Sequence, residues 1–290
     1  MKIAGRAIGP GHPVFLQAEL GVTTNGNLRR ALELVDVVAN AGADAAKFIC
    51  TNPDAIMRSK DGLFTYETMH GRTTRPIYHL LKETMFTFAE WAQIAARCRA
   101  RGIIFYATVD WLGGLDLLAP LDPPAWKVSC WDLTWRPLLA ALRATGKPVL
   151  VDVGTATREE VRAAIPDDAA DLLFVHDPHP RDGRDWNMSR VRGFFQPTYP
   201  FGFSSPGREL WCDFVALAGG ACLIEKRLTA ARDDPEGHHH AVSLEPDEFT
   251  AWVREIRLAE AALAEDPFAG SEAAWADRKM YDRDAEGLRP

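Results

Sequence analysis

Val14-Phe15-Leu16-Gln17-Ala18-Glu19 is a short apolar run that ends in a carboxylate, and seven similar runs follow along the chain. These seven are Ala43–Phe48, Ile103–Thr108, Ala125–Ser129, Pro148–Asp152, Asp171–His176, Tyr199–Ser204 and Ala221–Lys226. Short, nearly continuous apolar runs are typical of strands that are buried on both faces. The sequence therefore predicts eight strands of this kind.

Segments with apolar residues at helical spacing separate these runs. They are the segment that begins at Leu28, then Phe88–Arg101, Pro137–Thr145, Arg158–Ile165, Glu209–Ala218 and Asp247–Leu263, with the sixth unit poorly marked. Alternating strands and helices predict right-handed crossovers and a parallel sheet. Eight units, in about the 250 residues that such a barrel needs, favour a closed (β/α)₈ TIM barrel of the α/β class. We expect a single barrel domain over residues 1–264 and a C-terminal tail over residues 265–290.

Composition narrows the partners and the compartment. The net charge is −7 with acids and bases mixed, so no basic stripe is present to bind nucleic acid or an anionic membrane. The N-terminal segment has no apolar signal region, and no apolar run approaches the roughly 18 residues of a membrane span. The five cysteines are scattered without a C-x-x-C motif, which favours reduced thiols. We expect a cytoplasmic protein, with a homodimer left open.

Two segments are too long and polar for plain loops of the repeat. Asn52–Glu83 follows the second expected strand and Arg227–Leu244 follows the eighth. Both come from the carboxyl ends of strands, where barrel active sites lie and long loops become lids. The alternative is that they are disordered insertions.

Polar residues stand at the ends of all eight expected strands, and in a barrel they converge on one mouth. They are Glu19, Lys47, Thr108, Lys127, Asp152, His176, Ser204 and Lys226. Three lysines at one mouth favour binding of a phosphate or carboxylate. Strand alternation decides which of these side chains point inward.

Several fragments, in matching order, carry a resemblance to a known family. They are Ala18-Glu19-Leu20-Gly21-Val22, Asn25-Gly26, Ala41–Phe48, Asp132-Leu133-Thr134, Thr145–Leu150, Gly154–Thr157 and Ser243–Glu248. Together they make the chain resemble the sialic acid synthase family from about Val14 to Ala264. In that family a (β/α)₈ domain condenses phosphoenolpyruvate with the open-chain aldehyde of an N-acetylated amino sugar, a transferase step of carbohydrate biosynthesis.

The resemblance implies roles for individual residues. Lys47, Thr108, Lys127 and Ser204 are expected to hold the phosphate and carboxylate of phosphoenolpyruvate, and Glu19 to lie near the reacting carbons. Further expected substrate residues are Asp132, Lys226 and His240, the last matching a family histidine that serves the substrate. Asp152 replaces a serine of the family, and an anion there counts against unchanged donor binding.

The metal-binding motifs depart from the family. Gly202-Phe203-Ser204-Ser205-Pro206 and Glu225-Lys226-Arg227 put proline and arginine where the family has its two metal histidines. We therefore expect no metal and no other cofactor, with Arg227 polarising a carbonyl in part. The chain also stops where the family's C-terminal antifreeze-like domain would begin.

Other interpretations stay open. A metal could be relocated to His176-Asp177-Pro178-His179 or to His238-His239-His240. The chain could be a lyase, isomerase or hydrolase that acts on a sugar acid, with Glu19 or His176 as proton carrier. It could also be a non-catalytic subunit. Trp131, which replaces a small family residue, could narrow the pocket.

Overall fold

Eight parallel strands close into one barrel in the computed structural model, which describes residues 1–164, 169–179, 183–190, 199–263 and 272–289. Around the barrel each strand pairs with the next in chain order, and the last pairs with the first. The strands are β3 (Phe15–Glu19), β4 (Ala45–Cys50), β7 (Ile104–Val109), β8 (Trp126–Val128), β9 (Val149–Asp152), β10 (Leu172–His176), β11 (Phe201–Ser205) and β12 (Leu223–Arg227). The predicted (β/α)₈ fold and its eight strands are confirmed.

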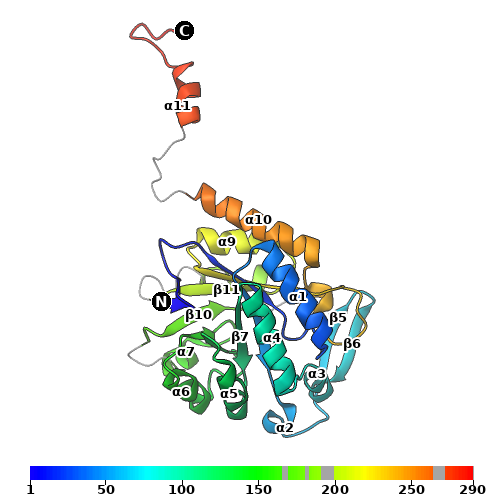
Figure 1. The fold of residues 1–290 in the computed structure, drawn as a ribbon. Coiled ribbons are helices and arrows are strands. Elements are labelled where there is room, and N and C mark those ends of the chain that lie inside the picture. The colour runs from blue at the N-terminus through cyan, green and yellow to red at the C-terminus, as the bar shows by residue number, and fades with distance from the viewer. Residues whose placement is uncertain (165–168, 180–182, 191–198, 264–271, 290) are drawn as a thin grey trace.

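Helices pack around the outside of the barrel (Figure 1). They are α1 (Leu28–Ala41), α4 (Phe88–Ala100), α5 (Leu112–Leu118), α6 (Arg136–Ala144), α7 (Arg158–Ala164), α9 (Trp211–Ala218) and α10 (Pro246–Ala262). Local signals set their ends: Asn27 caps α1, and Thr87 with Glu90 forms a capping box at α4. In the sixth unit the structure describes the short 3₁₀ turn η2 (Gly183–Asp185) after β10.

A two-stranded hairpin covers the amino end of the barrel. It comprises β1 (Lys2–Ile3) and β2 (Arg6–Ala7). Ile3 and the following Ile8 are buried in one cluster with inward side chains such as Phe15 and Leu223. The barrel interior is thus packed at that end, and polar groups concentrate at the other.

Alternation along β12 decides which of its polar residues enter the barrel. Leu223 lies in the inner cluster, and Ile224 lies in the outer one beneath the helices. Successive side chains of a strand point to opposite faces. Glu225 and Arg227 therefore point inward, and Lys226 points toward the helices.

The insertion after β4 is ordered, which rules out a disordered segment there. It contains α2 (Pro53–Ile56), the antiparallel hairpin of β5 (Leu63–Thr68) and β6 (Gly71–Pro76), and α3 (Ile77–Glu83). The ring centroids of Phe64 and Tyr66 lie 5.7 and 5.9 Å from that of His238. His238 precedes η3 (His240–Val242), so the insertions after β4 and β12 meet.

The C-terminal segment carries α11 (Glu272–Lys279), which stands away from the barrel in Figure 1. The expected boundary between barrel and tail falls within residues 264–271, outside the described residues. None of the described helices combines the length and apolarity that a membrane span requires.

Candidate active site

The centre of the site is the carboxylate of Glu225, which points into the barrel from β12. Lys127 Nζ on β8 donates to both carboxylate oxygens, at 2.8 and 2.9 Å. Ser204 Oγ on β11 donates to Oε1 at 2.8 Å, and Gln17 Nε2 on β3 donates to Oε2 at 2.5 Å. Side chains from three neighbouring or facing strands, β3, β8 and β11, thus fix one buried carboxylate of β12 in place.

Lys47 on β4 completes this group from the side. Its Nζ lies 3.6 Å from Glu225 Oε1, and it forms an ion pair with Glu19 at the end of β3. Burial opposes the charge of Glu225, but Lys127 and Lys47 outweigh that cost and hold its pKa well below the usual range. We call Glu225, Lys127, Lys47 and Ser204 the Glu225 cluster.

Lys47 and Lys127 differ in how firmly they keep their protons. Burial lowers the pKa of Lys47 to about 7, and the cations of Lys127 and Arg227 act in the same direction. Burial also opposes the charge of Lys127, but the carboxylates of Glu225, Asp152 and Asp177 raise its pKa overall. Lys127 is therefore the permanent cation of the cluster, and Lys47 is the one that titrates near neutral pH.

This difference predicts a pH dependence of stability that is specific to Lys47. Its pKa is about 7 in the folded chain against an ordinary 10.5. Between these pH values the unfolded chain binds the proton that the folded chain has released, so the free energy of unfolding rises with pH. The free energy of unfolding is measured by urea unfolding at pH 7, 8 and 9 for wild type and for Lys47→Gln. The difference between the two proteins should rise with pH by about 1 kcal/mol per pH unit. Parallel pH profiles for the two proteins would contradict the assignment.

Arg227 lies at the rim above the cluster. Its NH1 donates to the Ser205 carbonyl at 3.2 Å, and its NH2 lies 3.5 Å from Asp177 Oδ2. It is directly across from Glu19 in the pairing of β12 with β3. A permanent cation and a carboxylate therefore face the same part of the mouth, where they can act on one carbonyl group.

Thr108 offers a free hydroxyl at the mouth. It pairs in register with Lys127 on the neighbouring strand, and its Oγ1 is buried without a hydrogen-bond partner among the described residues. A buried hydroxyl without a partner is costly and available to a ligand. The expected anion residues Lys47, Thr108, Lys127 and Ser204 thus lie on β4, β7, β8 and β11 around one space.

The cations of the mouth are already accompanied by carboxylates. Lys47, Lys127 and Arg227 lie among Glu19, Glu225, Asp177 and Asp152, all buried except Arg227, which is half-buried. An incoming anion must share or displace these carboxylates. The expectation that Asp152 opposes donor binding has a physical basis here, since it interacts electrostatically with Lys127.

Lys226 does not join the other two lysines, contrary to expectation. It is fully buried, and its Nζ donates to Asp213 Oδ2, Ser205 Oγ and the Glu209 carbonyl at 2.7 to 2.8 Å. Asp213 belongs to α9 and also accepts from Trp252 Nε1 of α10. Lys226 therefore ties the barrel to its helices, because the residue after an inward Glu225 must point outward.

His176 also points away from the mouth. Its Nε2 lies 2.8 Å from the Trp186 carbonyl, and its ring lies beside Phe203 in the outer layer. Burial lowers its pKa, so a neutral ring is favoured. The expected catalytic placement is wrong, because the inward neighbour Val175 forces His176 to the other face. The relocated metal site over residues 176–179 is therefore not formed as predicted.

The remaining expected residues lie in loops. Asp132 follows β8 and is partly buried, and burial with the nearby Asp110 raises its pKa to about 7. His240 Nδ1 lies 2.7 Å from Thr229 Oγ1 and its Nε2 lies 3.4 Å from Asn25 Oδ1. Trp131 is 70% exposed and packs on His179.

Sequence reasoning left Glu225 and Gln17 out of the site and considered Asp177 only as a ligand of a relocated metal, although the geometry puts all three at the mouth. Tyr106, which donates to Gln17 Oε1, was missed as well. Period-two alternation supplies the missing signal. Counting back from Glu19 places Gln17 on the same face, and counting from Leu223 places Glu225 there.

Comparison with known proteins assigns this chain to one family. Residues 34–267 match the model of the NeuB family. Spore coat polysaccharide biosynthesis protein SpsE of Bacillus subtilis is 31% identical over 90% of this chain and 72% of its own length. N,N'-diacetyllegionaminic acid synthase of Legionella pneumophila is 28% identical over 86% of this chain and 73% of its own length.

The structural comparison agrees on the fold. N-acetylneuraminic acid (sialic acid) synthetase of Leptospira borgpetersenii, solved with citrate, superposes with a TM-score of 0.83 and 24% identity. The match covers 96% of this chain and 94% of that one. The chain belongs to the NeuB family, and the resemblance to sialic acid synthases is confirmed.

Proposed function

We propose that this chain condenses phosphoenolpyruvate, or a similar small anion, with the aldehyde of a sugar acceptor. The observation that carries the proposal is the Glu225 cluster, in which two lysines and a serine from three strands surround the carboxylate of Glu225 at the mouth. A phosphate or carboxylate is bound well by ammonium groups and neutral donors in a partly closed pocket. The named synthases among the relatives support the same class of reaction.

The proposed reaction joins C3 of the enol donor to the aldehyde carbon. Water adds at C2 of the donor, the carbonyl oxygen becomes a hydroxyl, and phosphate leaves. Lys127, Lys47 and Thr108 hold the donor anion, with Ser204 orienting Glu225 among them. Arg227 and Glu19, which pair across neighbouring strands, face the acceptor carbonyl.

An ion cannot be held at the two positions where the family's motifs place histidine. The side chain of Pro206 has no atom that can bind a metal, and the positively charged guanidinium of Arg227 repels a cation. We propose that Arg227 polarises the acceptor carbonyl there instead. This part of the reaction then requires no metal at those positions.

The test is phosphate release from phosphoenolpyruvate with a panel of amino-sugar aldehydes, with and without EDTA. We expect release that survives EDTA. The assignment of Lys47 and Lys127 to donor binding is wrong if no acceptor leads to phosphate release and calorimetry detects no binding of phosphoenolpyruvate. Release that EDTA abolishes would exclude the metal-free proposal.

Arg227→Met is expected to lower kcat by about 100-fold or more, the usual effect of removing one group that stabilises developing charge. Affinity for phosphoenolpyruvate should change little, because the donor lies on the Glu225 cluster. Arg254→Met, at an exposed arginine of α10, is the matched control and should leave both quantities unchanged. An equal loss of donor affinity in Arg227→Met would place the arginine at the donor instead.

A further inference from the structure

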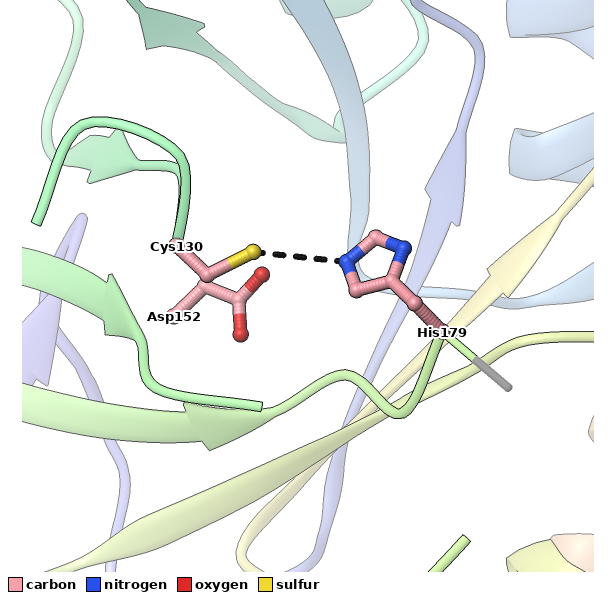
Figure 2. A group of neighbouring side chains, drawn as sticks. All are labelled: Cys130, Asp152 and His179. Atoms are coloured by element: carbon pink, nitrogen blue, oxygen red, sulfur yellow. Dashed lines mark hydrogen bonds between the residues drawn. The ribbon is translucent and has the colours of Figure 1, made fainter. Parts of the chain in front are cut away.

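Three side chains with metal-ligating atoms converge at the ends of consecutive barrel strands (Figure 2). Cys130 follows β8, Asp152 ends β9 and His179 follows β10. Their ligand atoms all lie within 4.8 Å of one another, and Cys130 Sγ lies 3.3 Å from His179 Nε2. Among the described residues this is the only such group of three.

The fold, rather than chance contact, brings these loops together. β8 pairs with β9 at Val128 and Val151, and β9 pairs with β10 at Asp152 and Val175. After β9 the chain passes Gly154, where an added Cβ would lie 1.8 Å from the Asp177 carbonyl oxygen. Only glycine permits this approach, which sets the end of β9 against the segment that leads to His179.

Further contacts hold Asp152 and His179 in position. Arg190 donates from NH1 and NH2 to the carbonyls of Val153, Gly154 and Ala156, at 2.7 to 3.0 Å. The Trp131 ring packs on His179 with a centroid distance of 4.9 Å. Asp152 Oδ1 accepts from the Gly154 amide at 2.8 Å. His179 and Asp152 are thus each oriented by a neighbour, as ligands of built metal sites are.

We propose that Cys130, Asp152 and His179 bind one zinc-type divalent cation at the barrel mouth. A thiolate, an imidazole and a carboxylate form a ligand set that suits Zn²⁺ and Co²⁺, whereas a thiolate disfavours Mg²⁺ and Ca²⁺. Bond lengths of about 2.0 to 2.3 Å in a tetrahedron place ligand atoms about 3.5 Å apart. The separation of Sγ and Nε2 is close to that value.

The arrangement fits a metal better than a nucleophilic thiol. In a cysteine nucleophile the carboxylate holds the far nitrogen of the imidazole, behind the ring. Figure 2 shows Asp152 beside the thiol, away from that nitrogen. The ligand atoms of all three groups lie around a common point. A metal ion at that point could bind all three, whereas a proton relay would need them in a row.

The electrostatic surroundings also favour a cation. Asp152 and Asp177 are both buried and repel each other, and the nearby cations already have other partners, since Lys127 pairs with Glu225 and Arg227 with Asp177. A divalent ion at Asp152 offsets this excess of negative charge. Three protein ligands leave a fourth position open, as in catalytic rather than structural zinc sites.

Cobalt absorption tests the site directly. After treatment with a chelator and its removal, the full chain is titrated with Co²⁺ alone. We expect one ion per chain, a near-ultraviolet band from thiolate-to-cobalt charge transfer, and visible bands of a four-coordinate ion. One equivalent of Zn²⁺ should remove them. Cys130→Ser should lose the charge-transfer band, and Asp152→Asn and His179→Ala should weaken binding at least tenfold.

Matched variants control for fold and for other ligands. Cys98→Ala in α4 and His12→Ala at an exposed loop should keep the full spectrum, and circular dichroism should show every variant folded. A spectrum that persists in Cys130→Ser, or that requires His238 or His239, overturns the site. So does a Cys130 that reacts rapidly with iodoacetamide in a chain that binds no cobalt.

The readout separates this site from the proposed condensation. Chelation that removes the cobalt spectrum but leaves phosphate release intact supports both proposals. A normal spectrum with no phosphate release leaves the ion site standing and removes the condensation.

Discussion

Lys127→Met is expected to abolish measurable binding of phosphoenolpyruvate and to destabilise the chain by about 3–5 kcal/mol. Lys127 is the cation that pairs with both oxygens of Glu225, and both side chains are buried. Removing one partner of a buried ion pair leaves an uncompensated charge, which costs this much. Calorimetry with phosphoenolpyruvate and urea unfolding measure the two effects separately.

A second substitution distinguishes binding from folding at this position. In Lys127→Met/Glu225→Gln the lone buried charge is gone, so stability should recover in part while donor binding stays absent. Lys147→Met is the surface control, since Lys147 pairs with the highly exposed Asp122 and should cost no more than about 1 kcal/mol. A Lys127→Met protein that binds phosphoenolpyruvate normally would contradict the donor assignment.

Lys226→Met is expected to destabilise the chain by a similar amount, about 3–5 kcal/mol, with donor affinity unchanged in the folded protein. Lys226 and Asp213 are both 0% exposed, and Asp213 also accepts from Trp252. The substitution leaves a buried carboxylate between β12, α9 and α10 without its cation. Urea unfolding gives the loss, and calorimetry at a temperature where the variant is folded gives the affinity.

An exposed ion pair provides the control for Lys226→Met. Lys82 pairs with Asp54 on the surface at 2.6 Å, so Lys82→Met should leave the free energy of unfolding nearly unchanged. Asp213→Asn combined with Lys226→Met should regain much of the lost stability, because no buried charge remains. A large drop in phosphoenolpyruvate affinity in folded Lys226→Met would return this lysine to the mouth, as the sequence had predicted.

The barrel was predictable because each strand carries its own signal. Eight apolar runs with helical segments between them admit few arrangements, and the short-range pattern alone defines them. The convergence of Lys47, Lys127 and Ser204 followed from the same argument, since the carboxyl ends of barrel strands share one mouth. The resemblance to the family added the ligand that these residues are expected to bind.

The prediction from strand ends did not establish which side chains point into the barrel and which point toward the helices. Lys226 and His176 stand at strand ends, yet each follows an inward residue and so points to the helices. Applying alternation from Leu223 and Val175 would have corrected both and brought Glu225 into the site. The His176 result also removes one of the two proton carriers on which the lyase or isomerase interpretation relied.

Other features depend on contacts that no local pattern encodes. The β5–β6 hairpin lies where the length and polar composition of residues 52–83 suggested a lid or, alternatively, a disordered insertion. Cys130, Asp152 and His179 come from three separate loops, and their spacing along the chain has no metal-site pattern. Their proximity follows from pairing of β8, β9 and β10 and from the close passage at Gly154.

The aromatic contact of Phe64 and Tyr66 with His238 has a practical consequence for engineering. It makes the segments that follow β4 and β12 a matched pair, although 143 residues of chain (84–226) lie between them. A chimera that imports only one of these segments from a relative would leave unfilled space against the other. Swaps intended to alter the preference for the proposed acceptor should therefore exchange both segments together.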